Sequence, residues 1–95
     1  MINAVIQYNS DKVEQDDLIY PTYHLLNSLN QKLTGKQISN NTYRDIFEPY
    51  QTQFLEQFEK FGVEKKDAVK WNNLKHRKDN EIIVNDLYKS IINNV

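Results

Sequence analysis

The fold is decided by the stretch YRDIFEPYQTQFLEQFEKF, residues 43–61, in which apolar side chains recur with the period of an α-helix. The charged and amide side chains between them fall on the opposite side. Polar neighbours cannot cover so wide an apolar stripe, so the stretch predicts a central helix packed against other helices. The stripe consists of Tyr43, Ile46, Phe47, Tyr50, Phe54, Leu55, Phe58 and Phe61.

Pro49 lies inside this stretch. An interior proline loses one backbone hydrogen bond and clashes with the preceding turn, at a cost of about 3 kcal/mol. Because the apolar stripe keeps its phase across Pro49, we expect a helix that is kinked or tightly broken near residues 45–49. Thr42 and Asp45 have the spacing of a capping pair and predict where it begins. Gly62 predicts where it ends.

Three further segments place apolar residues at helical spacing. The first runs from Pro21, a residue suited to the opening position of a helix, to Gly35, which adopts left-handed backbone angles at low cost. The second covers residues 64–75, and the third begins at Asp79 or Asn80. Their stripes are, in order, Tyr23, Leu26, Leu29 and Leu33; Ala68, Val69, Trp71 and Leu74; and Ile83, Val84, Leu87, Tyr88, Ile91 and Val95.

The chain is therefore predicted to be all-α, a single domain over residues 1–95 built as a small bundle of four or five helices. Residues 1–9 are too few to distinguish a short helix from a short strand. Acidic side chains dominate residues 10–17. For residues 1–17 as a whole, a loosely attached N-terminal arm is the alternative to a packed element.

The composition excludes the common catalytic motifs. Without cysteine the chain has no thiol nucleophile and no zinc–thiolate site, and its two glycines cannot build a phosphate-binding loop. His24 and His76 lie far apart in sequence, and neither has a second metal-type ligand at helical spacing. We therefore expect a non-enzymatic protein that uses no cofactor and no metal.

The sequence shows neither a secretory leader nor a membrane span. The longest apolar run, Ile82-Ile83-Val84, is far too short to cross a bilayer, and the N-terminus lacks a basic and apolar leader. We expect a cytoplasmic protein that does not enter the membrane. Twelve asparagines, and ten lysines against two arginines, suggest an AT-rich coding sequence of bacterial or phage origin.

Positive charge is concentrated in residues 60–78. Seven basic and two acidic side chains give this segment a net charge of +5, so the remainder carries −6 of the total of −1. Residues 50–75 also have the outline of a helix-turn-helix unit, with the turn at Gly62. We hypothesise that this segment binds nucleic acid. The candidate contacts are Lys65, Lys66, Lys70, Asn73, Lys75, Arg77 and Lys78.

Phe58 departs from the helix-turn-helix pattern, which has a small residue four positions before the turn glycine. A lysine-rich, solvated helix face explains the same charges without a ligand. The alternative partner is a protein, with the chain acting as an inhibitor, immunity protein or adaptor of phage or mobile-element type. Its candidate contacts are Asp16, Asp17 and Trp71, although Trp71 also suits a core position. A homodimer through the aromatic stripe is a further alternative.

Overall fold

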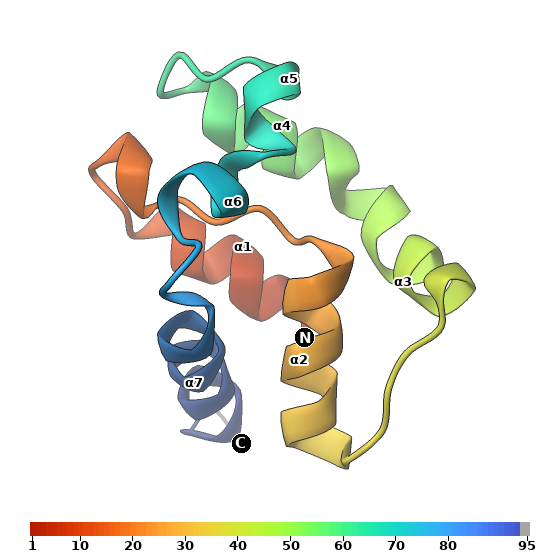
Figure 1. Cartoon of the computed structure of the whole chain (residues 1–95). Helices are drawn as coiled ribbons and strands as arrows, with labels where there is room; N and C mark the ends of the chain where they lie inside the picture. The colour runs from red at the N-terminus through yellow and green to blue at the C-terminus, as the bar shows by residue number, and fades with distance from the viewer. Residues whose placement is uncertain (94–95) are drawn as a thin grey trace.

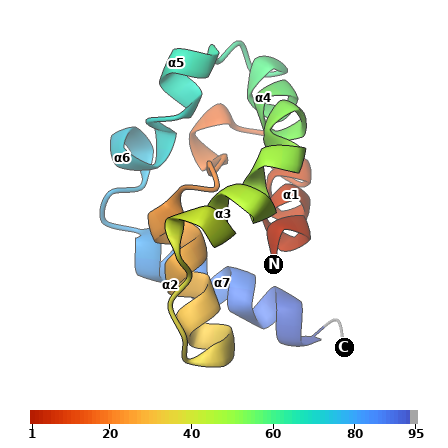
Figure 2. The ribbon, with the colours of Figure 1, turned by 90° about the vertical axis from the view of Figure 1, so that its right-hand side faces the viewer.

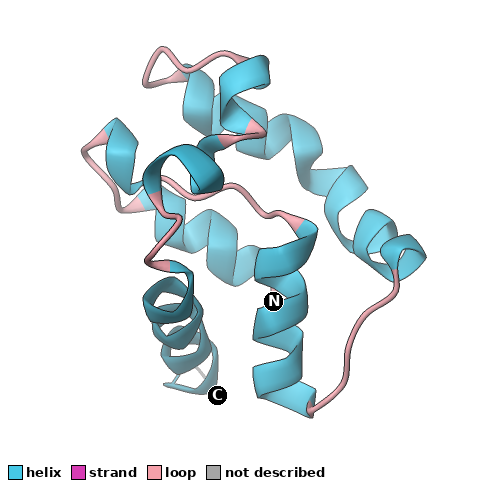
Figure 3. Ribbon diagram, in the orientation of Figure 1, coloured by secondary structure: helices cyan, strands magenta, loops and turns pink. Residues whose placement is uncertain are grey.

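The computed structural model describes residues 1–93, which form helices joined by loops, with no strand among those residues (Figures 1 and 3). The all-α prediction is confirmed. Five of the helices have eight or more residues: α1 (Ile2–Ser10), α2 (Tyr23–Thr34), α3 (Asn40–Phe47), α4 (Gln51–Glu59) and α7 (Asn80–Asn93). The shorter elements are the 3-10 turns η1 (Gln15–Asp17) and η2 (Glu48–Tyr50) and the helices α5 (Lys65–Ala68) and α6 (Trp71–Lys75).

The helices pack around one core. Helix α7 contacts α1 and α2, α1 also contacts α4, and α2 contacts α3. Figure 2 shows α5 and α6 stacked along one edge of the molecule, with α4 and α1 along the other. The principal extents are 36 × 27 × 25 Å. This arrangement leaves α5, α6 and the start of α7 as neighbouring parts of one surface.

The central helix is broken at the proline, as the sequence predicts. Helix α3 ends at Phe47, one 3-10 turn contains Pro49, and α4 resumes at Gln51. The aromatic stripe keeps its phase, because Phe47, Phe54 and Phe58 are all buried in the core. Pro49 is tolerated there because it lies at the start of the 3-10 turn, where a backbone amide has no partner within the turn.

Several predicted boundaries shift by a few residues. Ser39, not Thr42, caps α3, since the Ser39 hydroxyl accepts a hydrogen bond from the Thr42 amide at 3.1 Å. Thr22 caps α2 in the same way, so Pro21 precedes the helix instead of opening it. Gly35 and Gly62 both have a φ of 77°. Gly35 directly follows α2, as predicted, whereas α4 ends at Glu59, before Gly62.

The helix predicted over residues 64–75 is wrong as a single element. It divides into α5 and α6, because the Lys70 amide bonds to the Asp67 carbonyl three residues back and Lys70 takes φ −105° and ψ 2°. Helix α5 has only four residues. The helix-turn-helix-like unit predicted over residues 50–75 therefore has no continuous second helix, because the helix is interrupted at Lys70 between α5 and α6.

The N-terminal segment forms a helix rather than a strand. Helix α1 places Ile2 and Val5 in the core and contacts α4 and α7, so these residues are packed rather than loosely attached. Residues 11–17 form an exposed loop with the turn η1. At the other end of the chain, α7 buries Ile83, Val84 and Leu87, while Val95 of the predicted stripe lies outside the described residues.

The centre of the core is not a helix but the segment Leu18, Ile19 and Tyr20, which is fully buried. A buried segment without helical hydrogen bonds needs other partners for its amides and carbonyls. Asn9 supplies them for Ile19, donating to its carbonyl at 2.8 Å and accepting from its amide at 2.9 Å. Asn72 does the same for Tyr20, at 2.7 and 2.8 Å.

Aromatic rings link this buried segment to the helices around it. The Tyr20 ring packs edge-on against Phe47 and Phe58, at centroid distances of 5.5 and 6.0 Å. The Phe58 ring in turn meets Trp71 at 5.8 Å. Contacts of this kind add about 0.5–1.5 kcal/mol each to the effect of burial. The predicted aromatic stripe of α3 and α4 is thus covered largely by the central segment.

Candidate functional site

All seven residues predicted to contact nucleic acid are exposed: Lys65, Lys66, Lys70, Asn73, Lys75, Arg77 and Lys78. They come from α5, α6 and the connection to α7. Because α5 and α6 are separate short helices, these residues do not lie along one helix face. The structure therefore divides them into groups with different surroundings.

Two of the lysines are paired with carboxylates. Lys66 Nζ lies 3.6 Å from Glu64, and Lys75 Nζ lies 3.3 Å from Asp16. Lys65 lines a surface groove of about 480 Å³ between α4 and α5, together with Glu59 and Glu64. Exposed ion pairs of this kind contribute little to stability, but they reduce the local positive potential.

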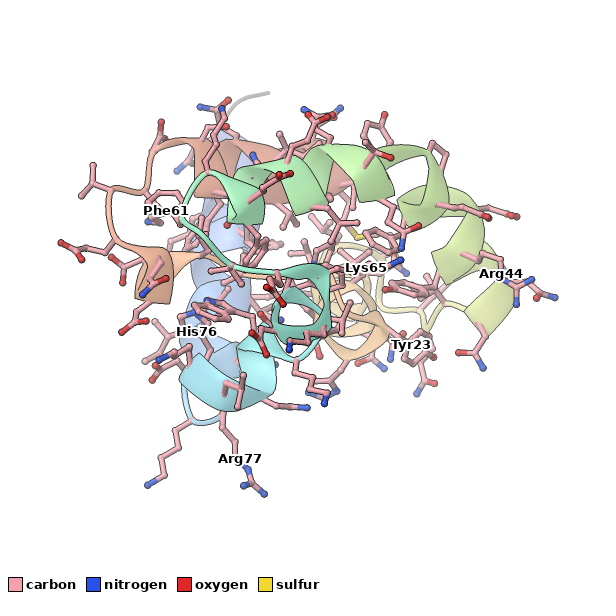
Figure 4. All side chains as sticks on the ribbon, turned by 90° about the horizontal axis from the view of Figure 1, so that it is seen from above. Tyr23, Arg44, Phe61, Lys65, His76 and Arg77 are labelled. Atoms are coloured by element: carbon pink, nitrogen blue, oxygen red, sulfur yellow. The ribbon has the colours of Figure 1, made fainter. Side chains whose placement is uncertain are left out.

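The other three cations, Lys70, Arg77 and Lys78, form no ion pair within residues 1–93. With Asn73 they make up what we call the basic corner, which spans the start and end of α6 and the connection to α7. Figure 4 shows Arg77 extending away from the body of the molecule, well separated from Lys65. The positive surface is therefore smaller than the charge of the whole segment suggests.

Beside the basic corner lies a polar pocket of about 260 Å³ between the start of α2, α6 and the start of α7. The structure here unites His24 and His76, whose separation in sequence gave no sign of a common site. His76 Nε2 lies 2.8 Å from the Leu18 carbonyl, and Asn72 is held by its two bonds to Tyr20. The pocket is lined by Thr22, His24, Asn72, Asn73, His76, Arg77 and Asn80.

Trp71 belongs to the core, being only 6% exposed. Its indole Nε1 donates a hydrogen bond to the Gln15 carbonyl at 3.1 Å, and its ring packs against Phe58. Of the two sequence-based interpretations, the core position is the one that this burial supports. Asp16 and Asp17 are exposed on η1. The pair between Asp16 and Lys75 joins one candidate protein contact to one candidate nucleic-acid contact.

Three apolar side chains near the basic corner are exposed. Val69 is 40% exposed, Leu74 59% and Ile82 61%. The apolar stripe of the predicted 64–75 helix includes Val69 and Leu74. The break at Lys70 removes that stripe, because it lets Trp71 enter the core while Val69 and Leu74 stay in contact with solvent.

The titratable groups with a raised pKa include Tyr8, Tyr20 and Tyr43. Burial, followed by the carboxylates of Asp86, Asp17 and Asp79, raises the pKa of Tyr8. No three histidine or carboxylate side chains in that part of the chain are placed to hold a metal ion. None of the described helices is both long and apolar enough to cross a membrane.

Comparison of the chain with models of protein families, with curated proteins and with solved structures gave no match. A function is therefore inferred only from the residues of this chain.

Proposed function

We propose that this chain is a non-enzymatic binding protein that contacts the phosphates of nucleic acid through the basic corner. The observation that carries the proposal concerns Lys70, Arg77 and Lys78, which flank α6. All three are exposed and form no ion pair within the described residues, whereas Lys66 and Lys75 do. Cations that are not neutralised by carboxylates are the ones that attract a polyanion.

The short length of α5 and α6 determines which part of the nucleic acid the basic corner can contact. A recognition helix that enters the major groove presents several side chains to base edges, and α5 and α6 have four and five residues. Lysine and arginine on such short elements and on a connection reach phosphates rather than a run of bases. Phosphate contacts position a protein on the nucleic acid without reading its sequence. Binding is therefore expected to depend strongly on salt and weakly on sequence.

The test compares two variants that lose the same charges. The first is Lys70→Ala/Arg77→Ala/Lys78→Ala, which removes the basic corner. The matched control is Lys36→Ala/Arg44→Ala/Lys89→Ala, which also removes two lysines and one arginine, all exposed and on other segments. Figure 4 shows Arg44 on the side of the molecule away from Arg77.

The readout is the fluorescence anisotropy of labelled duplex and single-stranded DNA between about 50 and 200 mM salt. The wild-type protein is expected to bind more weakly as salt rises. Loss of the basic corner should reduce the salt slope by about one for each phosphate contact removed, while the control keeps most of the slope. Absence of binding at low salt, or equal losses in both variants, overturns the proposal.

A protein partner is the second candidate, favoured by the exposed Val69, Leu74 and Ile82 beside the basic corner. Apolar side chains surrounded by cations suit an acidic protein surface. In this role the chain acts as an inhibitor, immunity protein or adaptor. A partner captured after nuclease treatment and lost with Leu74→Asp, while Ile92→Asp on another segment retains it, supports this candidate over nucleic acid.

A further inference from the structure

We infer that the polar pocket between α2, α6 and α7 is a binding site for a single phosphoryl group. The inference rests on the proposed function, since nucleic acid is one source of such a group. It adds a defined phosphate-binding pocket next to the basic corner. Asn73 and Arg77 belong to both. A phosphate in the pocket therefore touches the same surface that we expect to bind the backbone.

The lining selects an anion. Within residues 1–93, the side chains that line the pocket include one guanidinium, two imidazoles, three amides and one hydroxyl, and none of them is a carboxylate. Arginine and amide groups are the common partners of phosphate oxygens. An apolar ligand finds little to contact in such a lining, and no carboxylate of the described residues is present there to attract a cation.

Part of the pocket is rigid. Asn72 is fixed by its two bonds to the Tyr20 backbone, and His76 by its bond to the Leu18 carbonyl. Because a carbonyl can only accept, His76 Nε2 must carry the hydrogen in that bond. The ring is therefore held in one orientation, with Nδ1 as its remaining polar atom. Preorganised groups of this kind lose little freedom when a ligand arrives.

The remaining groups are free to bind. His24 and Arg77 have no hydrogen bond or ion pair to another side chain in the described part of the chain, and both are exposed at the pocket. Asn73 is exposed beside Arg77. With a volume of about 260 Å³, the pocket is below the usual range for whole small-molecule ligands, about 300–1,000 Å³. A phosphoryl group fits that size better than a complete nucleotide.

The experiment observes the site directly through its histidines. The chain has two histidines, His24 and His76, so the imidazole ring signals in a carbon–proton NMR spectrum all come from the pocket. Inorganic phosphate is added at constant pH, with sodium chloride of equal ionic strength as the reference. Saturable shifts of both rings with phosphate, and not with chloride, are the expected result.

Variants then separate the pocket from the general positive charge. Arg77→Gln and His24→Gln are expected to weaken phosphate binding by about tenfold or more, because each loses a charge-assisted hydrogen bond. Lys78→Ala removes an adjacent cation that does not line the pocket, and it should change the affinity by less than about twofold. All three residues are exposed, and the fluorescence of the buried Trp71 checks that each variant is folded.

Two oligonucleotides identify the source of the phosphate. They share one sequence and a 3′ label, and only one carries a 5′ phosphate. Tighter binding of the phosphorylated strand, abolished by His24→Gln, assigns the pocket to a strand end. Phosphate shifts without that preference assign it to free phosphate. Absence of saturable shifts, or shifts unaffected by Arg77→Gln, overturns the inference. The salt-dependent binding of the basic corner is measured separately and survives that outcome, because Lys70 and Lys78 do not line the pocket.

Discussion

The side-chain amide of Asn72 forms two hydrogen bonds with the backbone of Tyr20, a residue 52 positions earlier in the chain. It accepts from the Tyr20 amide at 2.8 Å and donates to the Tyr20 carbonyl at 2.7 Å. The pair of bonds imitates the pairing of two strands, although the described chain contains no sheet. It attaches α6 to the buried central segment and so sets the position of the polar pocket.

Replacing Asn72 by alanine leaves the Tyr20 amide without a partner, whereas the Tyr20 carbonyl still accepts from the Thr22 amide at 2.8 Å. The variant is therefore expected to lose about 1–3 kcal/mol of stability. Urea unfolding followed by Trp71 fluorescence measures the change. The neighbouring exposed residue provides the control, since Asn73→Ala should alter the free energy of unfolding by no more than about 0.5 kcal/mol. Equal effects of the two variants would show that the bonds to Tyr20 contribute nothing.

Asn9 and Asn72 are expected to act on stability as a coupled pair. Asn9 of α1 bonds to the backbone of Ile19, and Asn72 of α6 bonds to the backbone of the adjacent residue Tyr20. Once the hydrogen bonds of one asparagine are lost, the backbone of residues 18–20 can shift, so the bonds of the other asparagine contribute less to stability. The double variant Asn9→Ala/Asn72→Ala should therefore lose less than the sum of the single variants, by about 0.5 kcal/mol or more. Strict additivity would contradict a shared segment.

Pro49→Ala tests whether the break between α3 and α4 stores strain. Pro49 sits in a 3-10 turn and is exposed, so alanine should change the unfolding free energy by less than about 1 kcal/mol. A proline strained inside a continuous helix would behave differently, since its removal would stabilise the protein by about 3 kcal/mol. Thermal and urea unfolding of the two proteins distinguish these cases.

Tyr43 is expected to make the protein sensitive to alkali. Its hydroxyl donates to the Pro21 carbonyl at 2.7 Å, and burial, with a smaller effect from Tyr20, raises the pKa of Tyr43 from 10.0 to about 12. A raised pKa in the folded state means that the stabilisation is complete below pH 10 and is lost as the pH rises towards about 12.

Tyr43→Phe removes that titration. At neutral pH the variant should be about 1 kcal/mol less stable because the hydrogen bond is gone. Its stability relative to wild type should then recover between about pH 10 and pH 12, the range in which the wild-type hydroxyl ionises on unfolding. Urea unfolding followed by circular dichroism at several pH values measures both proteins. A constant difference across that range would contradict the raised pKa.

Local rules predicted the features that depend on neighbouring residues. Pro49 breaks the central helix, and Gly35 follows α2, because each restricts or permits backbone angles at its own position. The aromatic stripe predicted the core face of α3 and α4, since helical spacing alone places Phe47, Phe54 and Phe58 on one side. The choice of Ser39 over Thr42 as the cap was missed, because both residue types suit that role.

The candidate site was predicted in part. The exposure of Lys70, Arg77 and Lys78 agrees with their position in a polar segment. The pairing of Lys75 with Asp16 was not predicted, because these residues approach only after the loop holding η1 packs near α6. The polar pocket was missed for the same reason, since His24 and His76 carry no local pattern that relates them.

The helical class and the apolar faces follow from the amino-acid sequence alone, because the period of an α-helix is a property of neighbouring residues. The central position of residues 18–20 in the core and the break of the 64–75 helix at Lys70 arise only when the chain is folded. Both depend on hydrogen bonds from Asn9, Asn72 and Trp71 to distant backbone atoms. Such bonds form only when the chain is folded, and no spacing in the sequence records them.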